Sequence, residues 1–193
     1  MKMRDKGLLI IFSGPSGTGK STVISKLMEL RDDIRFSVSA TTRAPRAGEE
    51  DGKHYFFKTR DEFLGMIGNN AFLEYAEYVG NFYGTPADPV DKNLKDGYNV
   101  LLDIEVQGAM QVMERRPDAV SVFLSPPSLD VLEDRLRSRG TDSEEKILGR
   151  LEAAKNELSK MDHYSYVIIN DNIDVAAKEL NAIITAEKCR SDK

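Results

Sequence analysis

Short apolar runs that alternate with helical patterns predict the fold of this chain. The apolar runs are continuous, as expected for strands covered on both faces, and occupy residues 8–12, 100–104, 120–124 and 166–169. The helical segments carry apolar residues at spacings of three and four, and occupy residues 106–114, 129–137, 144–158 and 175–188. The alternation predicts an α/β fold in which helices wrap a parallel sheet through right-handed connections.

Two stretches interrupt the alternation. Residues 37–86 are polar, aromatic and glycine-rich, with turn-forming pairs at Asp51-Gly52 and Gly80-Asn81, so we expect a small, mostly antiparallel insertion. Residues 126–160 are charged and helical, so we expect a helical flap that acts as a lid. We interpret residues 1–193 as a single domain whose core is formed by the remaining segments, 1–36, 87–125 and 161–193.

The pair Gly80-Asn81 also predicts which side chains share a face of the insertion. If these two residues form the centre of a hairpin, Val79 pairs with Phe82, Tyr78 with Tyr83, and Ala76 with Thr85. One face then carries Glu74, Tyr78, Tyr83 and Thr85, because side chains alternate along a strand. Taken alone, this arrangement is more typical of a solvated sheet face than of a binding site.

The segment GPSGTGKS, residues 14–21, follows the first apolar run and leads into a helical pattern at 22–30. Its spacing Gly-x4-Gly-Lys-Ser is that of a P-loop, in which backbone N–H groups and a lysine surround phosphates and the Ser hydroxyl binds Mg²⁺. A Gly/Ser-rich turn would explain a lone Gly-x-Gly but not this complete pattern. The expected nucleoside triphosphate site comprises Gly14, Pro15, Ser16, Gly17, Thr18, Gly19, Lys20, Ser21 and Thr22.

Two sets of arginines are candidates for further anion contacts. Arg43 and Arg46 flank a proline in the insertion, near Glu49 and Tyr55, and can form forked hydrogen bonds to a phosphate. The alternative is that they only keep a loop soluble. The flap carries a second set, Arg135, Arg139 and Arg150. Arginines on helices are most often surface ion-pair partners worth under about 1 kcal/mol each, but a closing lid could bring them to a phosphoryl group in transfer.

Asp103 ends the apolar run Val100-Leu101-Leu102, where a carboxylate at the exit of a strand could orient water bound to Mg²⁺; a turn or cap residue is an equally good interpretation. The sequence shows no Ser-His or Cys-His pairing. An acceptor that is itself a phosphate needs no general base, because its oxygens are already anionic at neutral pH. This favours transfer to a phosphate over transfer to an alcohol.

Composition limits the partners and the location. The chain has 193 residues, 40% of them hydrophobic, which is enough for one buried core. A net charge of -5 argues against general nucleic-acid binding. Cys189 is the only cysteine, so no internal disulfide forms and a reducing compartment is expected. The N-terminal apolar run is too short for a signal peptide or a membrane span, so we expect a cytoplasmic protein without a membrane partner.

The chain resembles the guanylate kinase family along essentially its whole length. The resemblance rests on five ordered segments: GPSGTGKS, FSVSATTRAPRAGEEDGKHY, EYAEYVGNFYGT, LLDIEVQG and RGTDSEEKILGR. It implies reversible, Mg²⁺-dependent phosphoryl transfer from ATP to GMP or dGMP. Two positions differ mildly from the family pattern, since Thr85 stands where Ser is common and Glu105 where Asp is common.

The resemblance also implies roles for individual residues. The GMP phosphate would be held by Arg43, Arg46, Tyr55 and Tyr83, with Glu49 beside the arginines. Guanine would be contacted by Ser39, Glu74, Thr85 and Glu105. Arg139 and Arg150 resemble lid arginines that reach both phosphate chains, while Arg135 and Asn170 resemble positions near the ATP end. We therefore expect catalytic roles for Lys20, Arg43, Arg139 and Arg150.

Two alternatives remain at this point. Guanylate-kinase-like domains also serve as non-catalytic phosphopeptide-binding modules, but these tend to have a degraded P-loop, whereas Lys20 and Ser21 are intact in this chain. A kinase of the same architecture could act on another phosphorylated acceptor, such as a phosphorylated ribose. Such a kinase would not need Ser39, Glu74 and Thr85 on a surface that reads a base.

Overall fold

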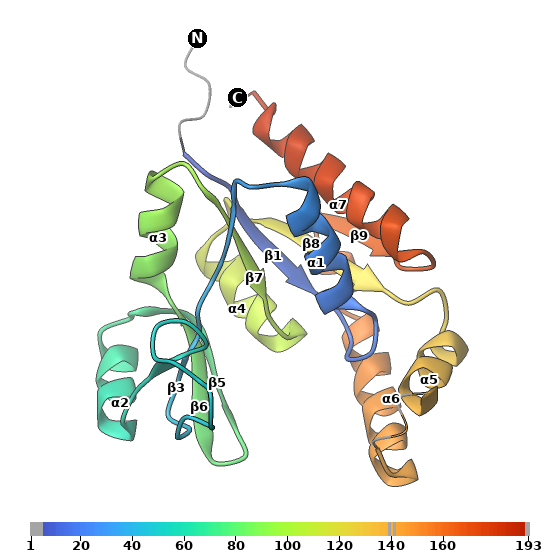
Figure 1. Cartoon of the computed structure of the whole chain (residues 1–193), viewed down its shortest axis with the longest axis horizontal. Coiled ribbons are helices and arrows are strands. Elements are labelled where there is room, and N and C mark those ends of the chain that lie inside the picture. The colour runs from blue at the N-terminus through green and yellow to red at the C-terminus, as the bar shows by residue number, and fades with distance from the viewer. Residues whose placement is uncertain (1–5, 139, 141, 192–193) are drawn as a thin grey trace.

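A parallel sheet forms the centre of the chain, and a computed structural model describes residues 6–138, 140 and 142–191 (Figure 1). Within these residues, five strands form this main sheet in the order β2-β7-β1-β8-β9, and all neighbouring strands are parallel. The strands are β1 (Leu9–Ser13), β2 (Ile34–Phe36), β7 (Asn99–Asp103), β8 (Val120–Ser125) and β9 (Tyr166–Ile169). The predicted α/β class is confirmed. Strand β2 was not predicted, because only Ile34 of its three residues is buried.

Helices cover both faces of the main sheet. One face packs against α1 (Lys20–Leu30) and α7 (Ile173–Lys188), and the other against α3 (Ala87–Lys95) and α4 (Val106–Arg115). Alternate residues of β1 face opposite ways: Ile10 and Phe12 join the cluster that includes α1 and α7, while Leu9 and Ile11 join the other. Both faces are buried, which explains the unbroken apolar runs. None of the described helices is long and apolar enough to cross a membrane.

A small sheet lies within the predicted insertion. Among the described residues it has four strands in the order β4-β3-β6-β5, namely β4 (Phe56–Phe57), β3 (Ala40–Thr41), β6 (Asn81–Pro86) and β5 (Phe72–Tyr78). The β3–β4 pair is parallel and the other two pairs are antiparallel, in agreement with a mostly antiparallel insertion. The segment also contains a helix that was not predicted, α2 (Arg60–Gly68), whose Phe63 stacks on Phe72 and Phe82.

The hairpin between β5 and β6 turns one residue earlier than predicted. Tyr78 pairs with Asn81, so Val79 and Gly80 are the central residues, both with positive φ (48° and 73°). The predicted pairs are therefore wrong, and Glu74 pairs with Thr85 instead. Asn81 is the first residue of β6, which pairs with β3. The next residue, Phe82, accepts a main-chain hydrogen bond from Thr42, so the strand and not the turn includes Asn81. The observed pairing is shifted by two positions from the predicted pairing. Because side chains alternate along a strand, this even shift leaves Glu74, Tyr78, Tyr83 and Thr85 on one face, as predicted.

The helices α5 (Leu129–Ser138) and α6 (Glu144–Leu158) form a separate unit with its own apolar contact, and a 3-10 turn (Met161–His163) follows them. Leu132 and Leu136 of α5 pack against Ile147 and Leu151 of α6. Figure 1 shows this pair projecting from the same end of the main sheet as the small sheet, but on the other side. Two projections therefore flank the end of the main sheet at which β1 leads into α1.

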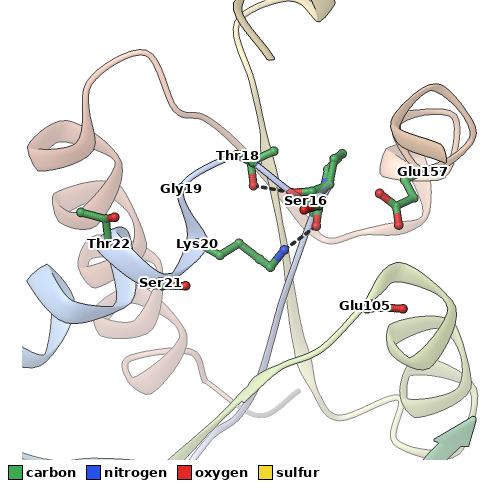
Figure 2. A pocket seen from close by; sticks show the side chains of 11 residues that line it. Ser16, Thr18, Gly19, Lys20, Ser21, Thr22, Glu105 and Glu157 are labelled. Carbon is green, nitrogen blue, oxygen red and sulfur yellow. Dashed lines mark hydrogen bonds between the residues drawn. The ribbon is translucent and has the colours of Figure 1, made fainter. Parts of the chain in front are cut away.

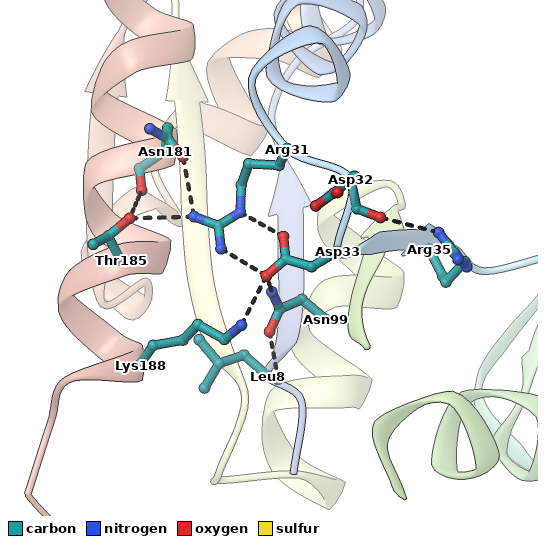
Figure 3. A network of polar contacts seen from close by, with 9 residues as sticks. All are labelled: Leu8, Arg31, Asp32, Asp33, Arg35, Asn99, Asn181, Thr185 and Lys188. Carbon is teal, nitrogen blue, oxygen red and sulfur yellow. Dashed lines mark hydrogen bonds and ion pairs between the residues drawn. The ribbon is translucent and has the colours of Figure 1, made fainter. Parts of the chain in front are cut away.

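A polar network holds the opposite end of the main sheet (Figure 3). Both carboxylate oxygens of Asp33 accept hydrogen bonds from Arg31, at 2.8 Å each, and Oδ2 also accepts from Lys188 Nζ at 2.7 Å. The side chain of Asn99 donates to Asp33 and accepts from the main-chain N–H of Leu8. Hydrogen bonds from Arg31, followed by Lys188, hold the pKa of Asp33 well below its usual range. The network joins the C-terminal end of α7 to the amino ends of three strands.

Candidate active site

The P-loop connects β1 to α1 and surrounds a cavity of about 320 Å³ (Figure 2). Lys20 is the first residue of α1, and its Nζ donates to the main-chain oxygen of Gly14 at 2.6 Å. The Thr18 hydroxyl closes the loop by donating to Pro15 O at 2.8 Å. The cavity is lined by the whole predicted triphosphate segment, residues 14–22, together with Glu105 and Glu157. The N-terminus of α1 and Lys20 thus face a space suited to anions.

Three carboxylates lie close enough to act on the charge of Lys20. Burial lowers the pKa of Lys20, and Asp103, Glu157 and Glu105 oppose this effect, in that order. Burial raises the pKa of Asp103, whereas the charge of Lys20 acts against the rise. Because Asp103 pairs with Phe12 across the β1–β7 ladder, its carboxylate lies one strand away from the P-loop. The phosphate-binding loop is therefore bordered by acidic groups at the carboxyl end of β7.

A second cavity, of about 530 Å³, lies on the other side of the P-loop. It is lined by Gly17, Gly19, Arg135, Asn170 and neighbouring residues. Arg135 donates to Asn170 O at 2.8 Å, and Asn170 Nδ2 donates to Thr18 O at 2.6 Å. Gly19 has φ of +92°, and a Cβ there would lie 2.7 Å from Asn170 Nδ2, so this close approach requires glycine. Arg135 and Asn170 are thus tied to the P-loop, and Gly17 and Gly19 line both cavities.

A third cavity, of about 370 Å³, opens between the small sheet and α4. Its lining includes the predicted residues Ser39, Tyr55, Glu74, Tyr83 and Glu105, together with Asp103. Glu105 lines both this cavity and the P-loop cavity, so the two meet at its side chain.

Glu74 is the buried carboxylate of this third cavity. Its side chain is buried, with only 8% of the residue exposed, and Oε1 accepts from the Thr85 hydroxyl at 2.6 Å. Burial raises the pKa of Glu74, and the hydrogen bond from Thr85 opposes this rise. A buried carboxylate with one oxygen held by Thr85 is suited to a ligand that offers hydrogen-bond donors.

The predicted anion-binding arginines lie in a loop beside this cavity. Arg43 Nη2 donates to Glu49 Oε1 at 2.8 Å, and Glu49 Oε2 accepts from the main-chain N–H of Arg46 at 2.7 Å. These contacts, led by the one from Arg43, lower the pKa of Glu49 to about 2. The Arg43 guanidinium lies 5.4 Å from the ring centre of Tyr55, which in turn contacts the ring of Tyr83 edge-on. Glu49 thus orients Arg43 and the backbone of Arg46, while Tyr55 and Tyr83 stand beside them.

Arg150 links the helix pair α5–α6 to the P-loop. Its Nη1 donates to Ser16 Oγ at 3.1 Å, and its Nε lies 3.5 Å from Asp142 Oδ2. The predicted lid residue Arg139 lies outside the residues that the structure describes.

Comparison with known proteins identifies the family. The family model for guanylate kinase matches residues 6–187. A guanylate kinase of Lactococcus lactis is 55% identical over 99% of this chain and 93% of its own length, and one of Bacillus subtilis is 50% identical over 99% and 94%. A crystal structure of guanylate kinase from Anaplasma phagocytophilum superposes with a TM-score of 0.74 at 38% identity, covering 98% of this chain and 90% of that one. The chain belongs to the guanylate kinase family. The family predicted from the sequence, and the ATP-dependent phosphorylation of GMP that it implied, are confirmed.

The cavities of this guanylate kinase also contain residues that sequence reasoning missed. Glu157 of α6 lines the P-loop cavity, and Gln107 and Gly108 of α4 line the third cavity. Glu157 is one of many charged residues on its helix, so nothing in the sequence distinguished it. Gly108 offered a usable signal, because a glycine inside a helix costs stability and is therefore retained for packing or function.

Proposed function

We propose that the three adjoining cavities divide the substrates of this guanylate kinase among them. The P-loop cavity would take the ATP phosphates, the cavity at Arg135 and Asn170 would take the adenine end, and the cavity at Glu74 would take GMP or dGMP. The observation that carries this assignment is that Glu105 lines both the P-loop cavity and the third cavity, while Gly17 and Gly19 line both the P-loop cavity and the second. Phosphate donor and acceptor would therefore meet near Glu105.

The ATP side would rely on Lys20 and the P-loop amides. Lys20 already points to a main-chain oxygen, so its charge is available inside the loop without a competing ion pair at that contact. Asn170 Oδ1 is buried without a hydrogen-bond partner among the described residues, and the 6-amino group of adenine would supply one. Arg135 would support this end by holding the main chain of Asn170.

A magnesium ion fits the groups between the P-loop and β7. Among the described residues, no cluster of three or more His, Cys, Asp and Glu side chains is arranged to hold a metal by itself. Mg²⁺ in nucleotide sites prefers phosphate oxygens and water with one or two protein ligands. Ser21 would provide a direct hydroxyl ligand and Asp103 would act through water. The ion would neutralise charge on the outer phosphates of ATP.

The acceptor phosphate would be held by Arg43, Arg46, Tyr55 and Tyr83. The Glu49 carboxylate keeps Arg43 beside the aromatic rings, so its guanidinium is oriented before substrate binds. Since the attacking oxygen of GMP is already anionic, the protein would need to align it and reduce repulsion, not remove a proton. Arg150, already in contact with Ser16, would stabilise the transferring group from the lid side together with Arg139.

Guanine would be recognised by Glu74, Ser39 and Thr85. Guanine presents N1–H and the 2-amino group side by side, and an ionised carboxylate accepts both, whereas adenine has an acceptor at N1 and no 2-amino group. The Ser39 hydroxyl would donate to guanine O6, while Thr85, whose one hydroxyl proton goes to Glu74 Oε1 at 2.6 Å, would act by holding that carboxylate in place. Glu105, which lies at the border with the P-loop cavity, would contact guanine from the side opposite the small sheet.

The test is a coupled assay of ADP release with the full chain, ATP and Mg²⁺, in which each nucleoside monophosphate is offered in turn. We expect good turnover with GMP, weaker turnover with dGMP, and hardly any with AMP. Comparable values of kcat/KM for AMP and GMP would contradict the assignment of the third cavity. Turnover with GMP that persists when Mg²⁺ is removed by chelation would contradict the proposed metal site.

A further inference from the structure

Helix α4 completes the hydrogen bonding along the outer edge of the small sheet. Strand β5 is an edge strand of this sheet, and its free side faces α4. The side-chain amide of Gln111 accepts from Tyr75 N at 3.2 Å and donates to Tyr75 O at 3.1 Å. One side chain thus makes the pair of hydrogen bonds that a neighbouring strand would otherwise make with this residue.

Two more residues on the same face of α4 contact β5. Gly108, Gln111 and Arg115 follow each other at spacings of three and four, which places them in one stripe along the helix. Arg115 Nη1 donates to Phe72 O near the start of β5. A Cβ at Gly108 would lie 2.9 Å from Glu74 Oε2, so the helix passes directly beside the buried carboxylate. The stripe therefore follows β5 from its start to the residue after Glu74.

The same helix is anchored at the phosphate end of the site. Its N-cap residue is Glu105, which borders the P-loop cavity, and β7 ends only two residues earlier at Asp103. Strand β7 pairs with β1, which leads into the P-loop. A short and continuous path of main chain and side chains therefore connects the P-loop to the backbone beside Glu74.

We propose that Gln111 is a positioning residue for recognition of the acceptor base. By holding both main-chain polar groups of Tyr75, it sets the direction of the adjacent Glu74 carboxylate relative to α4 and the P-loop. Gly108 has a complementary part, because the absence of a side chain leaves Glu74 Oε2 free to face the cavity. This inference rests on the proposed role of Glu74 in binding guanine, and it assigns no contact between Gln111 and substrate.

The test compares Gln111→Met with Glu114→Met in the full chain. Methionine preserves the length and helix propensity of glutamine but cannot make the two hydrogen bonds to Tyr75. We expect Gln111→Met to raise KM for GMP about tenfold and to reduce the preference for GMP over AMP by a similar factor, which corresponds to about 1.4 kcal/mol. KM for ATP should change less than about twofold. Glu114 lies on an exposed part of the same helix, so Glu114→Met should leave all of these constants unchanged.

A second variant separates positioning from stability. The methyl group of Gly108→Ala would lie 2.9 Å from Glu74 Oε2 and must displace the carboxylate, while the gain in helix propensity offsets part of the cost of this close contact. We expect a raised KM for GMP with an unchanged KM for ATP. If Gln111→Met lowers the melting temperature and raises both KM values equally, the role of Gln111 is structural and the inference is overturned.

The variant Glu74→Gln tells apart two kinds of failure. Loss of the preference for GMP in Glu74→Gln, with normal selectivity in both Gln111→Met and Gly108→Ala, would overturn the positioning role alone. An unchanged preference in Glu74→Gln would overturn the proposed guanine site itself, and the positioning inference with it.

Discussion

The substitution Glu74→Gln tests both how the base is recognised and how much the buried carboxylate costs in stability. The change keeps the size of a side chain that is only 8% exposed, so any effect comes from charge and hydrogen bonding. Thr85 donates to Oε1 at 2.6 Å, and in the variant the amide oxygen would take over this contact. The amide NH₂ group then occupies the position of Oε2 and presents donors to the two donors of guanine.

The expected magnitude follows from this mismatch. A hydrogen bond to a charged group contributes about 1.5–3 kcal/mol, and at least one is lost while a donor faces a donor. We therefore expect the ratio of kcat/KM for GMP to that for AMP to fall about a hundredfold in the coupled ADP-release assay. A ratio that stays within about threefold of the unmodified protein would refute the reasoning.

The same substitution should stabilise the protein without substrate. Burial raises the pKa of Glu74 in the folded state, so between its unfolded and folded pKa values the folded state binds more protons. The free energy of unfolding therefore falls as the pH rises through this window. Glu74→Gln removes the penalty, and we expect it to unfold at higher urea concentration than the unmodified protein at pH 8. The advantage should shrink as the pH falls through the raised pKa, and an equal gain at all pH values would contradict a charge-based origin.

Three other substitutions have distinct expected outcomes. Lys20→Ala should lower kcat/KM about a hundredfold or more while circular dichroism stays unchanged, and near-normal turnover at saturating ATP would contradict its role. Arg150→Ala should lower kcat about a thousandfold with KM for GMP little changed, whereas a raised KM with full kcat would mean ground-state binding only. Asp33→Asn should cost about 2 kcal/mol of unfolding free energy at pH 7 and leave kcat unaltered. Because the pKa of Asp33 is lowered on folding, the difference in unfolding free energy between the unmodified protein and Asp33→Asn should shrink as the pH falls below about 4. A difference in urea unfolding that stays constant with pH would be evidence against the ion pairs.

The core could be read from the sequence because its strands are buried on both faces. Predicted runs and observed strands of the main sheet agree within a residue or two at β1, β7, β8 and β9, since burial on two sides requires continuous apolar residues. The P-loop was found for a related reason, because phosphate binding by the backbone requires glycine and lysine at fixed spacing. The strand β2 gave no such pattern, and its place in the sheet depends on pairing with β7.

The insertion was harder to predict because long-range pairing determines its register. The turn-forming pair Gly80-Asn81 predicted a turn centred on these two residues. In the structure β6 pairs with β3, and the turn is centred on Val79 and Gly80 instead. Helix α2 did have a local signal, since Thr59 and Glu62 form a capping box that the sequence analysis overlooked.

The candidate site residues were found mainly through family resemblance. Side chains such as Glu74 and Glu105 come from separate elements, and only the packing of α4 against β5 brings them to one cavity. Glu157 and Gln111 remained hidden because their roles depend on that packing and not on a motif. The division into core, insertion and lid, and the role of each residue in the site, stay predictions.

The network around Asp33 has a consequence for how this molecule can change over time. It lies at the amino ends of the parallel strands, whereas all three cavities lie at the carboxyl ends or on the elements that project from them. Substitutions in this network therefore act at the opposite end of the strands from substitutions in the cavities. Stabilising substitutions around Arg31, Asn99 and Lys188 can therefore offset the stability lost through substitutions that change substrate preference at the other end of the strands.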